Sequence, residues 1–176
     1  MSIRMKLAVA LPLILTACAG APPLPQETGP SAFVIERDLA GSTVARGEFS
    51  AINGLKRGFT AYLDGELAGD TFTLKERFEY DDGEKDQKTW VLTLKGDGRY
   101  SGVREDVVGQ AKGWQDGAAF RLSYDVRLPN EKGEPGMQVH FQDVMVKTVD
   151  GVVLNRASVG KWGVRVARVE LKIRKP

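Results

Sequence analysis

Hydrophobic and polar residues alternate along much of the chain with a period of two. In TFTLKERFEY, the apolar Phe72, Leu74, Phe78 and Tyr80 share one side, and most of the residues between them are polar. This period is typical of a β-strand with one face buried, so the pattern predicts half-buried antiparallel strands. The same alternation occurs in WVLTL, FRLSYDVRL and RVELKI, at residues 90–94, 120–128 and 168–173.

Turn-forming sequences separate these alternating segments. They predict hairpins that join each strand to the next, because Asn-Gly and Asp-Gly pairs adopt the backbone conformations that tight turns need. The turn signals are Asn53-Gly54, Asp64-Gly65, Asp82-Gly83, Gly96-Asp97-Gly98, Asp116-Gly117, Pro129 to Gly136 and Asp150-Gly151.

The predicted strands follow one another without a convincing amphipathic helix, which indicates an all-β domain. A sandwich and a closed up-and-down barrel both fit, and the barrel is favoured because several strands reach about ten residues. Small residues also interrupt the inward faces, at Gly102, Ala111 and Gly113. We therefore predict a single antiparallel up-and-down β-barrel of about 8–10 strands. Barrels of this size are either filled by side chains or hold one ligand, and the sequence leaves both open.

The first 17 residues have the layout of a secretory signal peptide. Arg4 and Lys6 precede the apolar run LAVALPLIL at residues 7–15, and small residues follow it. The run is too short to span a bilayer as a helix, which takes about 20 apolar residues. Residues 1–17 are therefore expected to be an export signal.

Cys18 is the single cysteine of the chain and directly follows this segment. The sequence Leu15-Thr16-Ala17-Cys18 resembles the lipobox of bacterial lipoproteins, which implies lipidation of the Cys18 thiol and cleavage just before it. Stable anchoring by acyl chains needs two or more of them. Residue 19 is alanine, not the aspartate that signals inner-membrane retention. We thus expect a lipid anchor facing the periplasm, with the outer membrane favoured over the inner membrane.

Residues 18–30 have the composition of a flexible tether, with prolines at 22, 23, 25 and 30 and little apolar content. The remaining residues, 31–176, are assigned to the barrel domain.

The charge balance argues against nucleic acid as a partner. The chain has 25 Lys and Arg against 23 Asp and Glu. Arg4 and Lys6 leave with the signal peptide, so the mature chain is formally neutral and has no clustered basic stripe.

The C-terminal two thirds, together with the lipobox, resemble the DUF3833 family of bacterial lipoproteins, over about residues 45–175. This resemblance implies export, anchoring and a lipocalin-like barrel, but no reaction. The sequence departs from the family pattern at Gln142 and Val144, where a second acidic residue and an aromatic residue are more usual. The similarity lies in LKERFEYDDGE, YSGVREDVVGQAKG, VHFQDVMVK and NRASVGKWG.

Four polar residues share the strand parity of apolar neighbours and are expected to point inward: Glu76, Asp106, Asp143 and Asn155. A buried carboxylate is costly unless it finds a cation or a hydrogen bond, so the four are expected to converge. Arg104, Arg156, Lys161 and Arg165 are the available cations, and Arg104 or Arg156 is expected within salt-bridge distance of the cluster. The cluster would either fix the polar group of an apolar or amphiphilic ligand, or serve as a structural network that closes the barrel.

Other site chemistry finds little support in the sequence. His140 is the only histidine, has outward parity and lacks partners at metal-binding spacing, so no metal and no cofactor are expected. A Ser-His triad is disfavoured, since only an inward His140 is expected to reach a serine. Catalytic residues are not assigned. The favoured function is binding of an apolar small molecule, such as a lipid, or of an envelope partner.

Two alternatives stay open beside ligand binding. One is a small barrel enzyme that acts on an envelope lipid through Glu76 or Asp143. The other is a structural lipoprotein with a solid core. The sequence assigns no oligomeric state.

Overall fold

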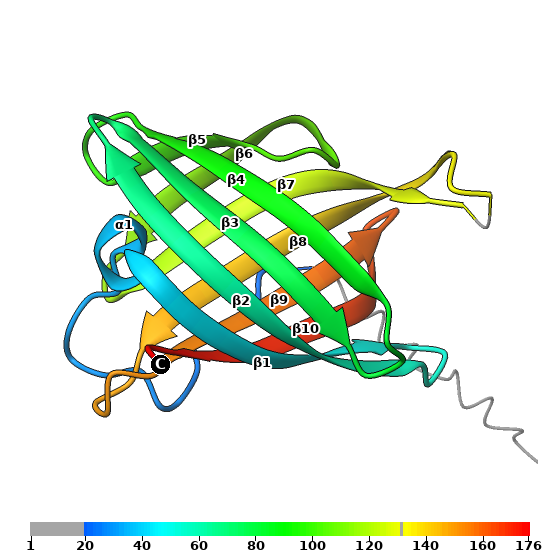
Figure 1. Cartoon of the computed structure of the whole chain (residues 1–176), viewed down its shortest axis with the longest axis horizontal. Helices are drawn as coiled ribbons and strands as arrows, with labels where there is room; N and C mark the ends of the chain where they lie inside the picture. Colours follow the sequence, from blue (N-terminus) through cyan, green and yellow to red (C-terminus); the bar gives the residue numbers. More distant parts are fainter. Residues whose placement is uncertain (1–19, 131) are drawn as a thin grey trace, which may run out of the picture.

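In the computed structural model of the chain, which describes residues 20–130 and 132–176, one short helix precedes ten strands (Figure 1). The predicted signal peptide and Cys18 lie outside the described residues. Among the described residues, no helix is long and apolar enough to cross a bilayer. The elements are α1 (Ile35–Asp38), β1 (Gly41–Ala51), β2 (Lys56–Ala68), β3 (Thr71–Tyr80), β4 (Lys85–Leu94), β5 (Arg99–Val103), β6 (Val107–Asp116), β7 (Ala119–Pro129), β8 (Pro135–Lys147), β9 (Val153–Lys161) and β10 (Val164–Arg174).

The strands form a closed barrel in which each strand pairs with its neighbours in sequence. The barrel closes where β1 pairs with β10, in antiparallel register from Val44 opposite Arg174 to Ala51 opposite Ala167. Closure gives every strand a partner on each side without a second sheet, although the short β5 pairs with only Val91–Leu94 of β4. The predicted all-β, antiparallel up-and-down barrel is confirmed, with ten strands.

The inward faces of the strands make the core, as the alternation predicts. On β3, Phe72 and Leu74 are buried, whereas Thr73 between them points outward. One cluster of buried side chains includes residues from all ten strands. The hydrophobic pattern therefore determines which face of each strand lines the interior.

The turn predicted at Asp64-Gly65 is wrong, because β2 continues to Ala68 and turns at Gly69, which has φ of +62°. Gly65 instead allows a close approach. A Cβ atom at this position would collide with the carbonyl oxygen of Leu39 and lie 2.8 Å from the Phe72 ring. The glycine thus leaves room for Leu39, the last residue of a segment that enters the barrel end.

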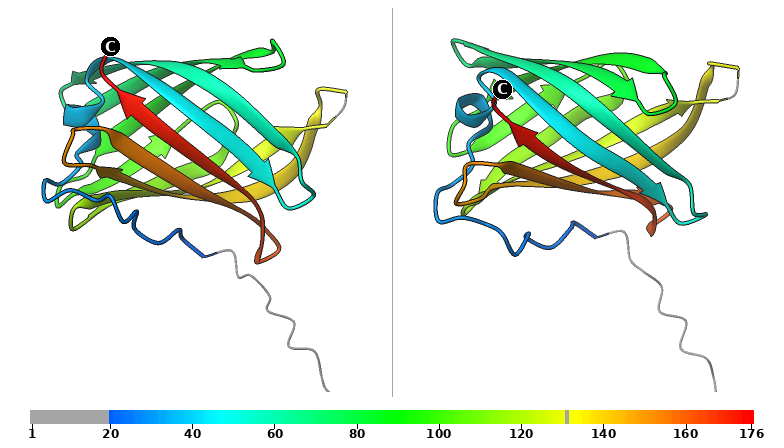
Figure 2. Two further views of the ribbon diagram at one scale, coloured as in Figure 1. Left: turned by 90° about the horizontal axis from the view of Figure 1, so that it is seen from below. Right: turned by 60° about the horizontal axis from the view of Figure 1, so that its bottom comes forward.

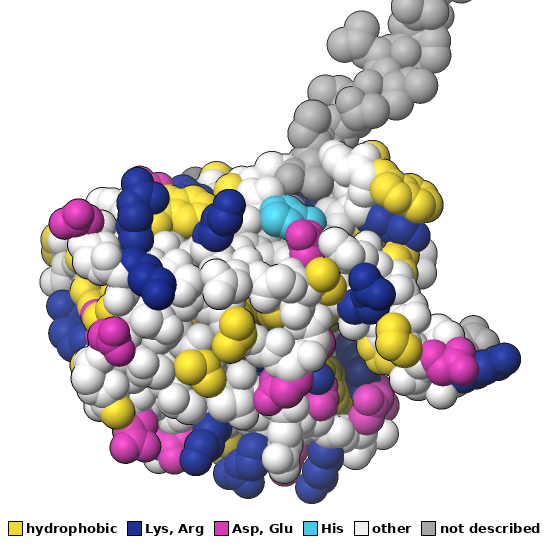
Figure 3. All heavy atoms as spheres, turned by 90° about the horizontal axis from the view of Figure 1, so that it is seen from above, with side chains coloured by type: hydrophobic (Ala, Val, Ile, Leu, Met, Phe, Trp, Pro, Cys, Tyr) yellow, Lys and Arg dark blue, Asp and Glu magenta, His cyan; other side chains and the backbone are white. Residues whose placement is uncertain are grey.

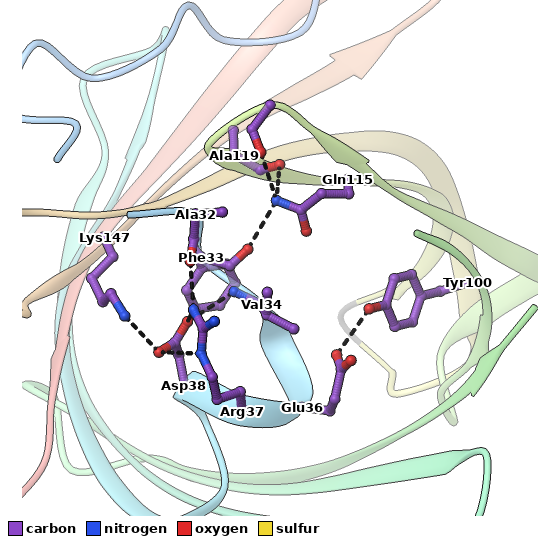
Figure 4. A network of polar contacts seen from close by, with 11 residues as sticks. Ala32, Phe33, Val34, Glu36, Arg37, Asp38, Tyr100, Gln115, Ala119 and Lys147 are labelled. Carbon is purple, nitrogen blue, oxygen red and sulfur yellow. Dashed lines mark hydrogen bonds and ion pairs between the residues drawn. The ribbon is translucent and has the colours of Figure 1, made fainter. Parts of the chain in front are cut away.

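Residues 33–39, which include α1, plug one end of the barrel and are called the plug below. Its side chains Phe33, Ile35 and Leu39 are buried in the core. Polar contacts tie it to three strands (Figure 4): Tyr100 donates to Glu36 at 2.9 Å, Lys147 to Asp38 at 2.9 Å, and Gln115 to the carbonyl of Phe33 at 3.0 Å. The plug closes this end of the interior, and the five turns at the other end surround the mouth of the barrel.

The described part of the predicted tether lies along the outer wall of the barrel (Figure 2). The amide of Gly29 donates to the carbonyl of Lys147 at 2.7 Å, and Arg121 donates to the carbonyl of Pro22 at 3.3 Å. On the same wall, the outward-facing Val144 and Val146 of β8 are fully buried. Residues 22–29 are therefore packed against the barrel rather than held away from it as a free spacer.

The strand phase gives a direct test. Leu74→Asp places a charge among the buried side chains and is expected to lower the free energy of unfolding by roughly 3–5 kcal/mol. Thr73→Asp, on the outward face of the same strand, is expected to change it by less than about 1 kcal/mol. Urea denaturation of both variants measures the difference, and equal losses would contradict the assigned phase.

Candidate functional site

The interior of the barrel holds a cavity of about 430 Å³. Its volume lies within the range of small-molecule sites, roughly 300–1,000 Å³. The solid-core alternative is therefore wrong for this barrel. Most of the lining is apolar or aromatic and includes Phe59, Phe78, Trp90, Leu92, Phe141 and Leu171.

The cavity runs from the plug to the mouth. Ile35 and Leu39 of the plug line it, and so do Leu55 and Arg57, which lie at the opposite end in the β1–β2 turn and the start of β2. A long apolar body could therefore extend along the barrel axis, with one end at the mouth.

A polar cluster lies on the wall of this cavity, formed by Glu76 of β3, Asp143 of β8, Asn155 of β9 and Arg104. The amide nitrogen of Asn155 donates to Asp143 at 3.0 Å, and the hydroxyl of Tyr124 donates to the same carboxylate. The sequence-predicted residues Glu76, Asp143 and Asn155 thus converge, because strands far apart in the chain face one lumen.

Arg104 enters the lumen because β5 ends at Val103, next to the longer strand β4. Its guanidinium lies 4.7 Å from the centroid of Trp90 and 5.4 Å from that of Tyr124. Such positions over aromatic faces stabilise a cation. The residue therefore carries its charge into an otherwise apolar wall.

Arg104 connects the carboxylates of the cluster. Its Nε donates to Asp106 at 2.7 Å, and its Nη1 lies 3.8 Å from Glu76. Asp106 belongs to the turn between β5 and β6 rather than to a strand, which corrects its predicted position. This aspartate joins the cluster from the side of the barrel.

Arg156 lies outside the cluster, which corrects its assignment as a candidate partner. It follows Asn155 on β9, and because consecutive residues of a strand point to opposite faces, it lies on the outer wall. There it is 3.8 Å from Glu170 and 3.9 Å from Glu27. Among the described residues, Arg104 is the arginine that pairs with Glu76 and Asp106, and Lys88 also lies 3.9 Å from Asp106.

Three buried oxygen atoms of the cluster have no hydrogen-bond partner among the described residues. They are Oε2 of Glu76, Oδ2 of Asp143 and Oδ1 of Asn155. An unpaired buried polar atom costs about 1–3 kcal/mol, so native proteins rarely leave one without a reason. All three residues line the cavity, which makes this wall a candidate for a ligand that donates hydrogen bonds.

Burial raises the pKa of Glu76 to about 7, and the positive charge of Arg104 offsets only part of that effect. Burial also raises the pKa of Asp143 to about 6, although the hydrogen bonds from Asn155 and Tyr124 act in the opposite direction. Both carboxyls can consequently gain and lose protons near neutral pH.

His140 has partners that sequence reasoning missed. Its Nδ1 lies 2.9 Å from Asp125, and its Nε2 lies 3.2 Å from the hydroxyl of Ser123. The expectation that only an inward histidine could reach a serine is wrong, because Ser123 and Asp125 both point outward from β7 beside β8. The histidine, cyan in Figure 3, lies exposed on the outer wall, apart from the lumen.

The described residues, 20–130 and 132–176, contain no group of three or more His, Cys, Asp or Glu side chains that could hold a metal ion. This includes the carboxylates of the lumen.

Three comparisons place the chain among known proteins. A family model described as "Protein of unknown function (DUF3833)" matches residues 12–175. The search of curated proteins found no match. Among solved structures, the S-type phycobiliprotein lyase CPES from Guillardia theta is similar, with a TM-score of 0.57 and 10% sequence identity over 79% of this chain and 88% of the lyase. At this identity the similarity shows the fold alone.

The raised pKa of Glu76 predicts a pH-dependent stability. The folded protein holds this proton up to a pH of about 7, whereas the unfolded chain releases it near the ordinary value of 4.5. The free energy of unfolding should therefore fall by roughly 1–3 kcal/mol as the pH rises from about 5 to about 8. Denaturation with urea across this range measures the slope.

Glu76→Gln should weaken this dependence, because glutamine resembles the protonated acid at every pH. The variant should match the wild type near pH 5 and be more stable near pH 8, with a residual slope from Asp143. Glu79→Gln, on the outward face of the same strand, should keep the wild-type slope. An unchanged slope in Glu76→Gln would show that Glu76 ionises normally.

Proposed function

The chain belongs to the DUF3833 family, and we propose that its barrel binds an elongated amphiphilic molecule. The apolar body of this ligand occupies the lumen, and a hydrogen-bond-donating group contacts Glu76, Asp143 and Asn155. The observation that carries the proposal is a set of three buried oxygens on the wall of an open apolar cavity that accept no hydrogen bond from any described residue, although Oε2 of Glu76 has an ion pair with Arg104.

The chemistry of the cluster supports a donor on the ligand rather than an acceptor. The atoms without a hydrogen bond from the described residues are carboxylate and amide oxygens, and the arginine beside them is engaged by Asp106 and by Glu76. A hydroxyl, amide or amine group would satisfy these oxygens. A carboxylate would meet like charges in a poorly solvated site, which is unfavourable. The ligand class is therefore a neutral or cationic amphiphile.

A second candidate function follows from the protonation of the same residues. Carboxyls with pKa values near the working pH are suited to general acid–base catalysis. With Glu76 at about 7 and Asp143 at about 6, the lumen could transfer a proton to or from a bound molecule. An enzyme acting on the bound amphiphile is therefore the runner-up, and it rests on these two carboxyls.

The anchor is proposed from the N-terminal sequence. The signal-like residues 1–17 and the lipobox-like residues 15–18 support lipidation of Cys18 and attachment at the periplasmic side of a membrane. Ala19 supports the outer membrane. The amphiphile-binding barrel would then work beside a lipid surface, which is the source of such ligands.

Binding can be measured with the fluorescent probe N-phenyl-1-naphthylamine. We expect saturable binding, with decanol and decylamine displacing the probe at least about tenfold better than decanoate. Ala61→Leu narrows the cavity that Ala61 lines and should weaken probe binding. Thr60→Leu, on the opposite face of β2, should leave it unchanged. Equal displacement by all three competitors would contradict the assigned role of the polar cluster.

Lipidation can be tested on the intact protein. Mass spectrometry of the wild type from membranes should show cleavage before residue 18 and the added mass of acyl chains. Cys18→Ser should lose that mass and remain soluble or uncleaved. A Cys18→Ser protein that is still cleaved before residue 18 and membrane-bound would overturn the anchor.

A further inference from the structure

Two neighbouring hairpin tips at the mouth of the barrel expose large hydrophobic side chains. In the β1–β2 tip, Ile52 is 74% exposed and Leu55 is 56% exposed. In the β9–β10 tip, Trp162 is 90% exposed and Val164 is 45% exposed. Both tips lie at the end opposite the plug (Figure 2). We call this group of four residues the rim patch.

The two tips are joined by the pairing that closes the barrel. Beyond the last paired residues of β1 and β10, the amide of Ile52 donates to the carbonyl of Val166 at 3.0 Å. Leu55 also lines the cavity, so the rim patch continues into the lumen. Exposed apolar side chains that adjoin a ligand cavity are unusual for a solvated loop and indicate a contact surface.

The charged residues within the two tips are positive, although Lys56 is 3.5 Å from Glu48 of β1. The tip segments 51–56 and 161–166 contain Lys56, Lys161 and Arg165 and no acidic residue. Lys161 lies 4.1 Å from the centroid of the Trp162 ring. Arg165 is exposed and forms no ion pair among the described residues. Apolar tips flanked by cations fit a surface that is apolar inside and negatively charged outside.

Two other turns at the ends of the barrel lack this combination. The adjacent β3–β4 turn carries Asp81, Asp82 and Glu84, and Arg57 binds the last two, at 2.7 Å in the case of Asp82. At the plug end, Val149 is exposed beside Asp150 and has no basic neighbour in its turn. The rim patch therefore differs from both of these turns in joining apolar side chains to positive charges.

We infer that the rim patch docks on the surface of an anionic lipid bilayer. Trp162, Ile52 and Leu55 would enter the boundary between headgroups and acyl chains, where tryptophan is favoured. The lysines and the arginine would contact lipid phosphates, which attract basic side chains near an anionic surface. Two protruding tips suit a deformable bilayer better than a complementary protein groove.

Docking of the rim patch would give the proposed ligand a path from the bilayer into the lumen. The inference rests on the proposed function only for this point, because an amphiphile could pass from the bilayer into the lumen beside Leu55 without entering water. The docking surface itself depends only on the side chains and charges of the two tips. The two proposals can therefore fail separately.

The test uses the full chain and vesicles that contain brominated phosphatidylglycerol and phosphatidylcholine. Bromine quenches only tryptophans that enter the bilayer, so binding through another part of the chain does not imitate the signal. We expect these vesicles to quench the tryptophan fluorescence of the wild type. In Trp162→Phe, the loss of tryptophan fluorescence should be at least several-fold smaller. Vesicles of brominated phosphatidylcholine alone should quench weakly.

The charge contribution has a matched control. With Lys161→Glu/Arg165→Glu, half-maximal quenching should need at least about tenfold more of the anionic lipid than with the wild type. Lys95→Glu/Arg99→Glu, which changes two exposed charges at the plug end, should behave as the wild type. Absence of quenching in the wild type, or equal effects of the two double variants, would overturn bilayer docking and favour a protein partner.

The probe-binding assay separates the two proposals. Both double variants should bind N-phenyl-1-naphthylamine in solution as the wild type does, because their charges lie outside the polar cluster. Quenching by vesicles without probe binding would leave docking in place and remove the ligand-binding function. Probe binding without quenching by vesicles would leave the ligand-binding function in place and remove docking.

Discussion

The pairing of β1 with β10 is the constraint on which the rest of the structure depends. Closing ten strands into one sheet gives each strand two neighbours, but it also makes a lumen wider than the inward side chains fill. The result is a cavity of about 430 Å³, which the plug closes at one end. The same closure sets the β1–β2 and β9–β10 tips next to each other, so the mouth acquires its apolar and basic side.

The hollow interior also explains how charged groups are tolerated there. Arg104 reaches the lumen through the side of the barrel, between Trp90 and Tyr124, and holds Asp106 and Glu76 near its guanidinium. One cation does not saturate all the acceptors. Among the described residues, one oxygen each of Glu76 and Asp143 accepts no hydrogen bond, and burial raises the pKa of both carboxyls. The site combines an apolar volume with unsatisfied acceptors, and this combination favours a donor-bearing amphiphile.

The sequence by itself determined most of the strands, their phase and three of the four inward polar positions, whereas Asp106 lies in a turn. Period-two alternation depends only on neighbouring residues, so Phe72 and Leu74 could be assigned to the core, and Glu76 with them, before any fold was known. Glu76, Asp143 and Asn155 were predictable for the same reason. The Asp64-Gly65 turn failed because a glycine can serve either a turn or a close approach, and the dipeptide does not distinguish them.

Only the tertiary structure decided which partners these residues meet. Arg104 enters the lumen because β5 ends at the residue before it, Val103. Arg156 points outward because it follows the inward Asn155 on β9. The size of the cavity depends on how many strands close and on the side chains that they bring together, and the plug depends on the space left by Gly65. Local pattern fixes the direction of a side chain, whereas distances between strands far apart in sequence are fixed only when the barrel closes.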